Sequence, residues 1–296
     1  MKKLFLLLAL ICSLPVLAQD EAVEEQANAV DESENNVVDG IVAKQHIKFK
    51  RNLKPHHVRE ASVLWSKTIW RMIDLREKQN LYLYYPTNSA VDDRRSLIRT
   101  LLDAISSGEL DAYSPNTDNE FEAKLPLTDI YEKLGITYSD SIVSVDPETG
   151  ESVTKYIYDM KNAPVDLVKK VLVKEVWFFD SRYTRLEVRI LGLCPIAIIM
   201  NEDGTRLDQV QLFWVYYPAA ERFLAKQEAY SAFNDAQRGS IHDMLQGRKF
   251  GSYIFKESNV YNNRIITSYA KGMASNIEAQ RIENSIFQKE HDMWAF

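Results

Sequence analysis

The centre of the chain, residues 168–218, most limits what this protein can fold into. Three runs rich in β-branched and aromatic residues follow one another there: VKKVLVKEVWFFD (168–180), YTRLEVRILGLCPIAIIM (183–200) and QVQLFWVYYP (209–218). Such residues fit the pleated surface of a sheet. The connections are short, DSR at 180–182 and NEDGTR at 201–206, where Asp203-Gly204 is a strong hairpin signal. We therefore predict an antiparallel meander.

The second run changes character along its length. YTRLEVRI alternates polar and apolar residues, which predicts a half-exposed strand, whereas CPIAIIM does not alternate and is expected to be covered on both faces. Cys194 opens that second part, so we expect it to be a small buried residue rather than a reactive thiol.

Helical patterns are predicted on both sides of the meander. In 61–80, Trp65, Ile69, Met72 and Ile73 are spaced i, i+4, i+7 and i+8, as on one face of an amphipathic helix. Further helices are predicted at 91–110 (Asp92 or Asp93 near the start, Gly108 at the end), 125–135 (Pro126 in the first turn, Gly135 as C-cap), 219–233 (opened by Pro218), 240–250 (stopped by Gly247) and much of 261–296. With a turn near 146–150 and a short strand at 152–160, the predicted fold class is α+β, a largely antiparallel central sheet flanked by helices.

The N-terminal part has three predicted sections. Residues 1–18 have a basic start, an apolar run too short to span a bilayer and small residues at the cleavage positions, as in a secretory signal peptide. Residues 19–59 are predicted to be a disordered arm: 19–43 carry eight acidic and no basic residues, and 44–59 carry six basic residues and three histidines. The basic stretch is expected either to dock on acidic groups or to remain a solvated connector. Residues 60–296 are expected to form the α+β domain.

No motif for chemistry is found. The five histidines lack zinc-site spacing, and there is no nucleophile elbow, Walker sequence or dinucleotide-binding glycine pattern. A pI near 5.5 and a signal peptide argue against nucleic acid. We therefore predict no catalytic, cofactor-binding or metal-binding residues, no small-molecule substrate and no enzymatic activity. Two alternatives stay open: a glycan- or peptidoglycan-binding module, and a periplasmic hydrolase that uses carboxylates brought together by the fold.

Aromatic residues are the remaining candidates for a binding surface, because large rigid rings dominate both cores and interfaces. Two segments, NLYLYYPTN (80–88) and LFWVYYPAA (212–220), are interpreted as strands that end in Tyr-Tyr-Pro, since proline cannot continue a sheet ladder. Different elements precede the two segments. We therefore favour two independent strand ends with the same sequence over an internal duplication of the chain. The candidate structural or interface aromatics are Trp65, Trp70, Tyr84, Tyr85, Trp214, Tyr216 and Tyr217.

The segments VLWSKTIWRMIDLREKQNLYLYYP, FWVYYPAAERFLAKQEAY and RILGLCPIA resemble the GldN/PorN family of gliding-motility and type IX secretion proteins, over about residues 55 to 290. The resemblance implies a periplasmic structural subunit that assembles into a ring with an outer-membrane lipoprotein, GldK/PorK, and contacts the motor protein GldM/PorM. It implies no enzymatic residues. As a ring component, the protein is expected to self-associate through two distinct faces.

Overall fold

The computed structural model describes residues 49–294, apart from 89, 92–93, 116–119, 137, 146–151, 159–162, 201–206, 232–233, 235 and 237. The predicted signal peptide, residues 19–48 of the predicted arm, and the predicted turns at 146–150 and Asp203-Gly204 lie outside the described residues.

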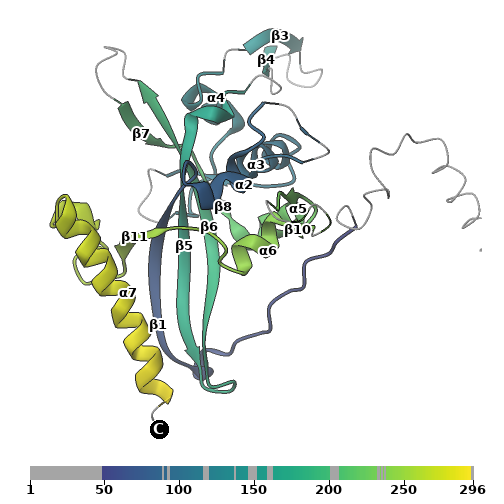
Figure 1. Cartoon of the computed structure of the whole chain (residues 1–296). Helices are drawn as coiled ribbons and strands as arrows, with labels where there is room; N and C mark the ends of the chain where they lie inside the picture. Colours follow the sequence, from purple (N-terminus) through teal and green to yellow (C-terminus); the bar gives the residue numbers. More distant parts are fainter. Residues whose placement is uncertain are drawn as a thin grey trace, which may run out of the picture. The chain divides into compact units, whose positions relative to one another are not determined.

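An antiparallel sheet forms the centre of the domain (Figure 1). Among the described residues it has seven strands, in the order β11-β1-β5-β6-β8-β2, with β7 also paired to β6. Its strands are β1 (Val63–Asp74), β2 (Ala112–Tyr113), β5 (Val168–Asp180), β6 (Arg185–Met200), β7 (Leu207–Gln211), β8 (Trp214–Tyr216) and β11 (Tyr253–Glu257). Two short pairs stand apart, β3 (Tyr138–Val145) with β4 (Ser152–Tyr158) and β9 (Glu228–Ala229) with β10 (Gly239–Ser240). The predicted α+β class with a largely antiparallel sheet is confirmed.

The predicted meander is present, with one difference. β5 and β6 pair along almost their whole length and have nearly the predicted bounds. The third run is divided, because Leu212 and Phe213 turn fully into the core between β7 and β8. As a result β7 and β8 pair with different parts of the same strand, β6.

The prediction of a helix at 61–80 is wrong. This part of the chain forms η1 (Glu60–Ser62) and the twelve-residue strand β1. Trp65, Ile69 and Ile73 differ by four positions each, a spacing that fits a helix and also the period of two of a strand. Only Met72 distinguishes a helix from a strand, because a helix would place it on the same face as Ile69. In the structure it lies with Trp70 on the opposite face of the sheet from Ile69. The pairing of β1 with β5 and β11 on its two sides therefore decided the structure.

The strand predicted before the first Tyr-Tyr-Pro is also wrong. Residues 78–84 form η2 (Lys78–Asn80) and one helical turn, α2 (Leu81–Tyr84). The buried side chain of Asn80 holds this turn, since its Nδ2 donates to the carbonyls of Asp74 (2.8 Å) and Gly251 (2.9 Å). The chain thus turns away from the sheet at the end of β1, and residues 81–84 form a helical turn where a strand was predicted.

The other helices follow the sequence signals more closely. They are α3 (Leu97–Ser106), α4 (Leu127–Lys133), α5 (Tyr217–Ala225), α6 (Ile241–Gln246) and α7 (Met273–Trp294), with the short η4 (Val165–Leu167) and η5 (Ile266–Ser268). α3 has Ser96 as its N-cap and so begins later than the predicted start near Asp92 or Asp93, two residues that lie outside the described part of the chain. The second Tyr-Tyr-Pro closes β8 and opens α5 as predicted, but α5 ends at Ala225, short of 233. The helix predicted within 261–296 begins only at Met273, after the positive φ of Gly272.

Three groups of buried side chains hold the layers together. The main core joins Ile73, Val173 and Leu193 of the sheet to α3, α5 and α6. On the same face, Ile282 and Ile286 of α7 pack against the Ile69 region of β1 and β11. A smaller group around Trp70, Leu172 and Trp214 lies on the other face. None of the helices that the structure describes is long and apolar enough to span a bilayer.

Residues 49–59 precede the sheet as an extended segment that contacts the folded domain. Lys50 pairs with Asp243 of α6, and Asn52 Nδ2 donates to Glu221 of α5 at 2.7 Å. Farther along, His56 Nε2 lies 3.4 Å from Asp180 of β5. In the described part of the basic stretch, Lys50 and His56 therefore lie beside acidic groups of the domain. The predicted disorder of residues 19–48 stays a prediction.

Candidate functional site

The seven candidate aromatics do not converge on one cleft. Tyr84 and Tyr217 belong to the main core on the helix-covered face, and Trp70 and Trp214 are buried on the opposite face. Trp65 is half-buried beside the α7 cluster. Tyr85 and Tyr216 are exposed at 57% and 42% of their surface. The sequence predicts core or interface packing for both Tyr85 and Tyr217. Tyr217 lies in the core and Tyr85 lies at the surface, so a role of Tyr85 in an interface stays a prediction.

Tyr217 takes part in a buried polar contact at the junction of α5 and α6. Its hydroxyl lies 2.9 Å from Nδ1 of His242, and the two rings stack. Burial lowers the pKa of His242, while the carboxylates of Glu221 and Asp243 raise it and the ammonium of Lys50 lowers it. The imidazole is therefore held neutral near pH 7, as a structural hydrogen-bond partner of the tyrosine.

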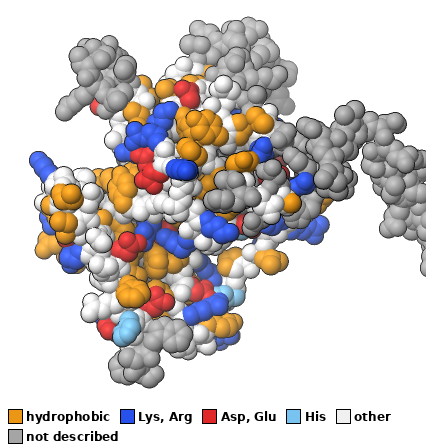
Figure 2. Space-filling model, in the orientation of Figure 1, with side chains coloured by type: hydrophobic (Ala, Val, Ile, Leu, Met, Phe, Trp, Pro, Cys, Tyr) orange, Lys and Arg blue, Asp and Glu red, His pale blue; other side chains and the backbone are white. Residues whose placement is uncertain are grey.

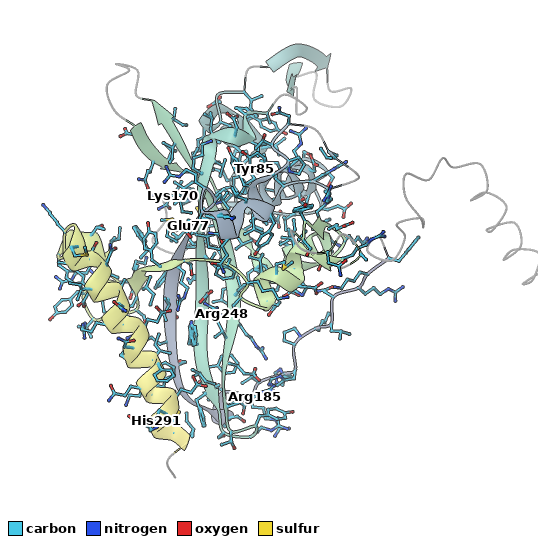
Figure 3. All side chains as sticks on the ribbon, viewed as in Figure 1. Glu77, Tyr85, Lys170, Arg185, Arg248 and His291 are labelled. Atoms are coloured by element: carbon cyan, nitrogen blue, oxygen red, sulfur yellow. The ribbon has the colours of Figure 1, made fainter. Side chains whose placement is uncertain are left out.

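A second polar network lies on the helix-covered face of the sheet. The carboxylate of Glu175, which is fully buried, accepts from Nη1 of Arg248 at 2.9 Å and from Nε1 of Trp177 at 3.1 Å. Nε of Arg71 lies 3.3 Å from the same carboxylate, and its Nη1 donates to Glu283 of α7. Figure 3 shows Arg248, from the segment after α6, directed at this face. The network ties β1, β5, α7 and the 248 segment together.

The sequence-based search missed this network, although one signal was present. Arg71 is a single charge inside the apolar run IWRMI, and Glu175 stands beside the apolar run VWFF. A charged residue in such a run must find a countercharge if it is buried. The partner's identity depends on the fold, because Arg71, Glu175 and Arg248 are far apart in the sequence.

An apolar groove of about 470 Å³ lies beside the first Tyr-Tyr-Pro. Tyr85, labelled in Figure 3, lines it with Pro86, Val91 and Tyr230. Val91 and Tyr230 are exposed at 50% and 49%. Such a cluster of exposed apolar side chains is typical of a surface that contacts other molecules.

Helix α7 carries a second exposed apolar surface. Its inner side chains, such as Ile282 and Ile286, are buried, but Met273, Ile277 and Phe287 are exposed at 74%, 62% and 70%. On the face of the molecule shown in Figure 2, hydrophobic side chains are interspersed with acidic and basic ones. The exposed residues of α7 and those near Tyr85 come from different elements and form two separate candidate surfaces.

Cys194 is fully buried, as predicted, with its Sγ 3.7 Å from the carbonyl of Pro195. Burial raises the pKa of its thiol, so the reactive thiolate is suppressed. Among the residues that the structure describes, no group of His, Cys, Asp and Glu side chains is arranged to hold a metal ion.

These observations define an α+β domain whose prominent surface features are exposed apolar side chains on the segment after α2 and on α7. The family model "Gliding motility associated protein GldN" matches residues 58–295, which is most of the chain, and the protein therefore belongs to the GldN family. The match confirms the resemblance seen in the sequence. A comparison with curated proteins finds no match.

Proposed function

We propose that this protein is a non-enzymatic structural subunit of the gliding-motility and type IX secretion machinery. It is exported by the signal peptide at residues 1–18 and acts in the periplasm. There it assembles into a ring with a GldK/PorK-like outer-membrane lipoprotein, through which it is associated with the outer membrane. It also contacts the periplasmic part of a GldM/PorM-like motor protein.

Membership of the GldN family over residues 58–295 carries this proposal. The exposed apolar surfaces support it, because a ring subunit needs two unlike faces for head-to-tail contacts with its neighbours. The outer side of α7, with Ile277 and Phe287, is one such face, and the groove beside Tyr85 is the other.

The test is to extract the native assembly from cell envelopes with mild detergent and to identify what copurifies. We expect a particle of high mass that contains the lipoprotein. Phe287→Asp, which charges the exposed side of α7, should reduce the yield of this particle, while Gln246→Asp, at an exposed position of α6 outside both surfaces, should leave it unchanged. Recovery of the unaltered protein as a lone monomer under these conditions would contradict the proposal.

A further inference from the structure

A polar cleft of about 770 Å³ lies on the face of the sheet opposite the main core. Its floor is formed by side chains of β1, β5, β8 and β11, among them Trp70, Lys174 and Lys256. Its walls come from Pro115 and Glu120 and from the loop after β11, which includes Asn262 and Asn263. A cleft of this volume accommodates several residues of an extended peptide.

The floor is built around one row of cross-strand neighbours. Lys256 of β11 pairs with Trp70 of β1, which pairs with Lys174 of β5, so the three side chains share one face. Nζ of Lys256 lies 4.0 Å from the centre of a Trp70 ring, and Nζ of Lys174 lies 5.3 Å from it. The indole is thus in cation–π contact with two ammonium groups.

Two β-bulges adjoin this row. The register shifts between Trp70 and Arg71 in the β1–β11 pair, and between Lys174 and Glu175 in the β5–β6 pair. Bulges redirect side chains and are frequent beside functional sites. Trp70 and Lys174 face the cleft, whereas the next residues, Arg71 and Glu175, belong to the buried network on the other face, because successive residues of a strand alternate in face.

The two lysines differ in their countercharges. Glu120 accepts from Lys174 Nζ at 2.7 Å and from Trp70 Nε1 at 2.8 Å, so it neutralises Lys174. Within the described part of the chain, no carboxylate lies within ion-pair distance of Lys256. Burial lowers the pKa of Lys256, only partly offset by the charge of Glu120. Among the described lining residues, the cleft therefore carries two ammonium groups and one carboxylate, and the ammonium of Lys256 has no carboxylate partner of its own.

The rest of the lining indicates what kind of anion fits. Trp70 and Trp214 are exposed at only 4% and 2%, so their ring faces offer no surface on which a sugar could stack. The remaining polar side chains of the lining are amides and hydroxyls, those of Thr68, Gln211, Ser258, Asn262 and Asn263. Amide groups pair with the N–H and C=O groups of a peptide, and a single excess positive charge matches one carboxylate.

We propose that this cleft binds a peptide segment through one carboxylate, which pairs with the Lys256 ammonium while the amides of the lining contact the peptide backbone. The site is independent of the ring proposed above, since it needs only the folded domain. Its specificity follows from charge: a peptide that carries glutamine in place of glutamate leaves the desolvated ammonium unpaired.

The test is a titration of the full domain with a peptide. It is monitored by NMR through isotope labels on the tryptophan indoles. The probe is acetyl-Gly-Glu-Gly-amide, compared with acetyl-Gly-Gln-Gly-amide, and Trp70→Phe assigns the indole signal beside Lys256. We expect the glutamate peptide to shift the Trp70 signal with a dissociation constant of about 1 mM and the glutamine peptide to bind about tenfold more weakly. Lys256→Gln should remove this preference, while Lys226→Gln, an exposed lysine outside the cleft, should retain it.

Three results would overturn the proposal. One is equal binding of the two peptides or no shift by either up to about 10 mM. Another is an unchanged preference in Lys256→Gln, whose backbone spectrum away from the cleft serves to show that the domain is folded. The third is a stronger shift of the Trp70 signal by chitotriose than by the glutamate peptide, which would assign the cleft to glycans.

Discussion

Replacing the buried carboxylate of Glu175 by an amide should be among the most destabilising single changes in this domain. Glu175 is fully buried and contacts Arg248 at 2.9 Å, Trp177 at 3.1 Å and Arg71 at 3.3 Å. In Glu175→Gln the guanidinium of Arg71, exposed at only 5%, loses its buried countercharge. Breaking a buried pair by removing one partner costs about 3–5 kcal/mol.

The lower end of that range applies here, because Arg71 keeps its contact with Glu283, whose side chain is 57% exposed. We therefore expect a loss of about 3 kcal/mol in the free energy of unfolding, roughly a 100-fold change in the folding equilibrium. The assay is urea denaturation monitored by tryptophan fluorescence, with Glu278→Gln as the control. Glu278 is partly exposed and pairs with Arg281, whose side chain is 66% exposed, and such a pair within one helix contributes at most about 0.5 kcal/mol.

A double variant separates charge from packing. Arg71→Met with Glu175→Met removes both buried charges and keeps similar side-chain volumes, so it should recover much of the stability that Glu175→Gln loses. The reasoning is refuted if Glu175→Gln costs less than about 1 kcal/mol, or no more than the Glu278 control. A double variant less stable than Glu175→Gln would show that the attraction between the charges outweighs their desolvation.

Three further outcomes are expected from the buried groups. Burial lowers the pKa of His242 from 6.5, so the folded state binds fewer protons than the unfolded chain. The free energy of unfolding therefore falls as the pH drops below about 6.5. When it is measured by urea denaturation from about pH 7 to pH 5, His242→Gln should lose the part of this pH dependence that comes from His242. With Cys12 changed to serine, Cys194 in the folded protein should react with a thiol reagent at least about 100-fold more slowly than in guanidinium chloride, and equal rates would contradict its burial. In Gly192→Ala the new Cβ would lie 2.5 Å from Cζ of Phe121, so we expect a loss of about 1–3 kcal/mol on denaturation, and a smaller loss when Phe121→Leu is added.

The central strands were predictable because their sequence signals are local and mutually consistent. β5 occupies the predicted residues 168–180, and β6 covers all but the first two residues of 183–200. Each run is long, is rich in β-branched and aromatic residues, and ends at a short connection. No competing helical pattern interrupts them, so propensity, periodicity and turn chemistry favoured the same structure.

β1 was not predictable from its own residues, because the spacing of Trp65, Ile69 and Ile73 is shared by a helix and a strand. The deciding information lies elsewhere in the chain. β1 is central because β5 pairs with it over residues 63–74 and β11 pairs with it from the other side. A strand buried on both faces has a nearly continuous apolar run, as at residues 69–73, and such a run carries little periodicity.

The candidate sites depend on a still finer property, the register between strands. Trp70, Lys174 and Lys256 become neighbours only because three separate strands align at these residues. A slip by one residue moves every side chain of a strand to its other face, which would place Lys174 in the apolar core and Glu175 in the cleft. The same register therefore sets both the buried network and the lysine cleft, which use adjacent residues of β1 and β5 on opposite faces.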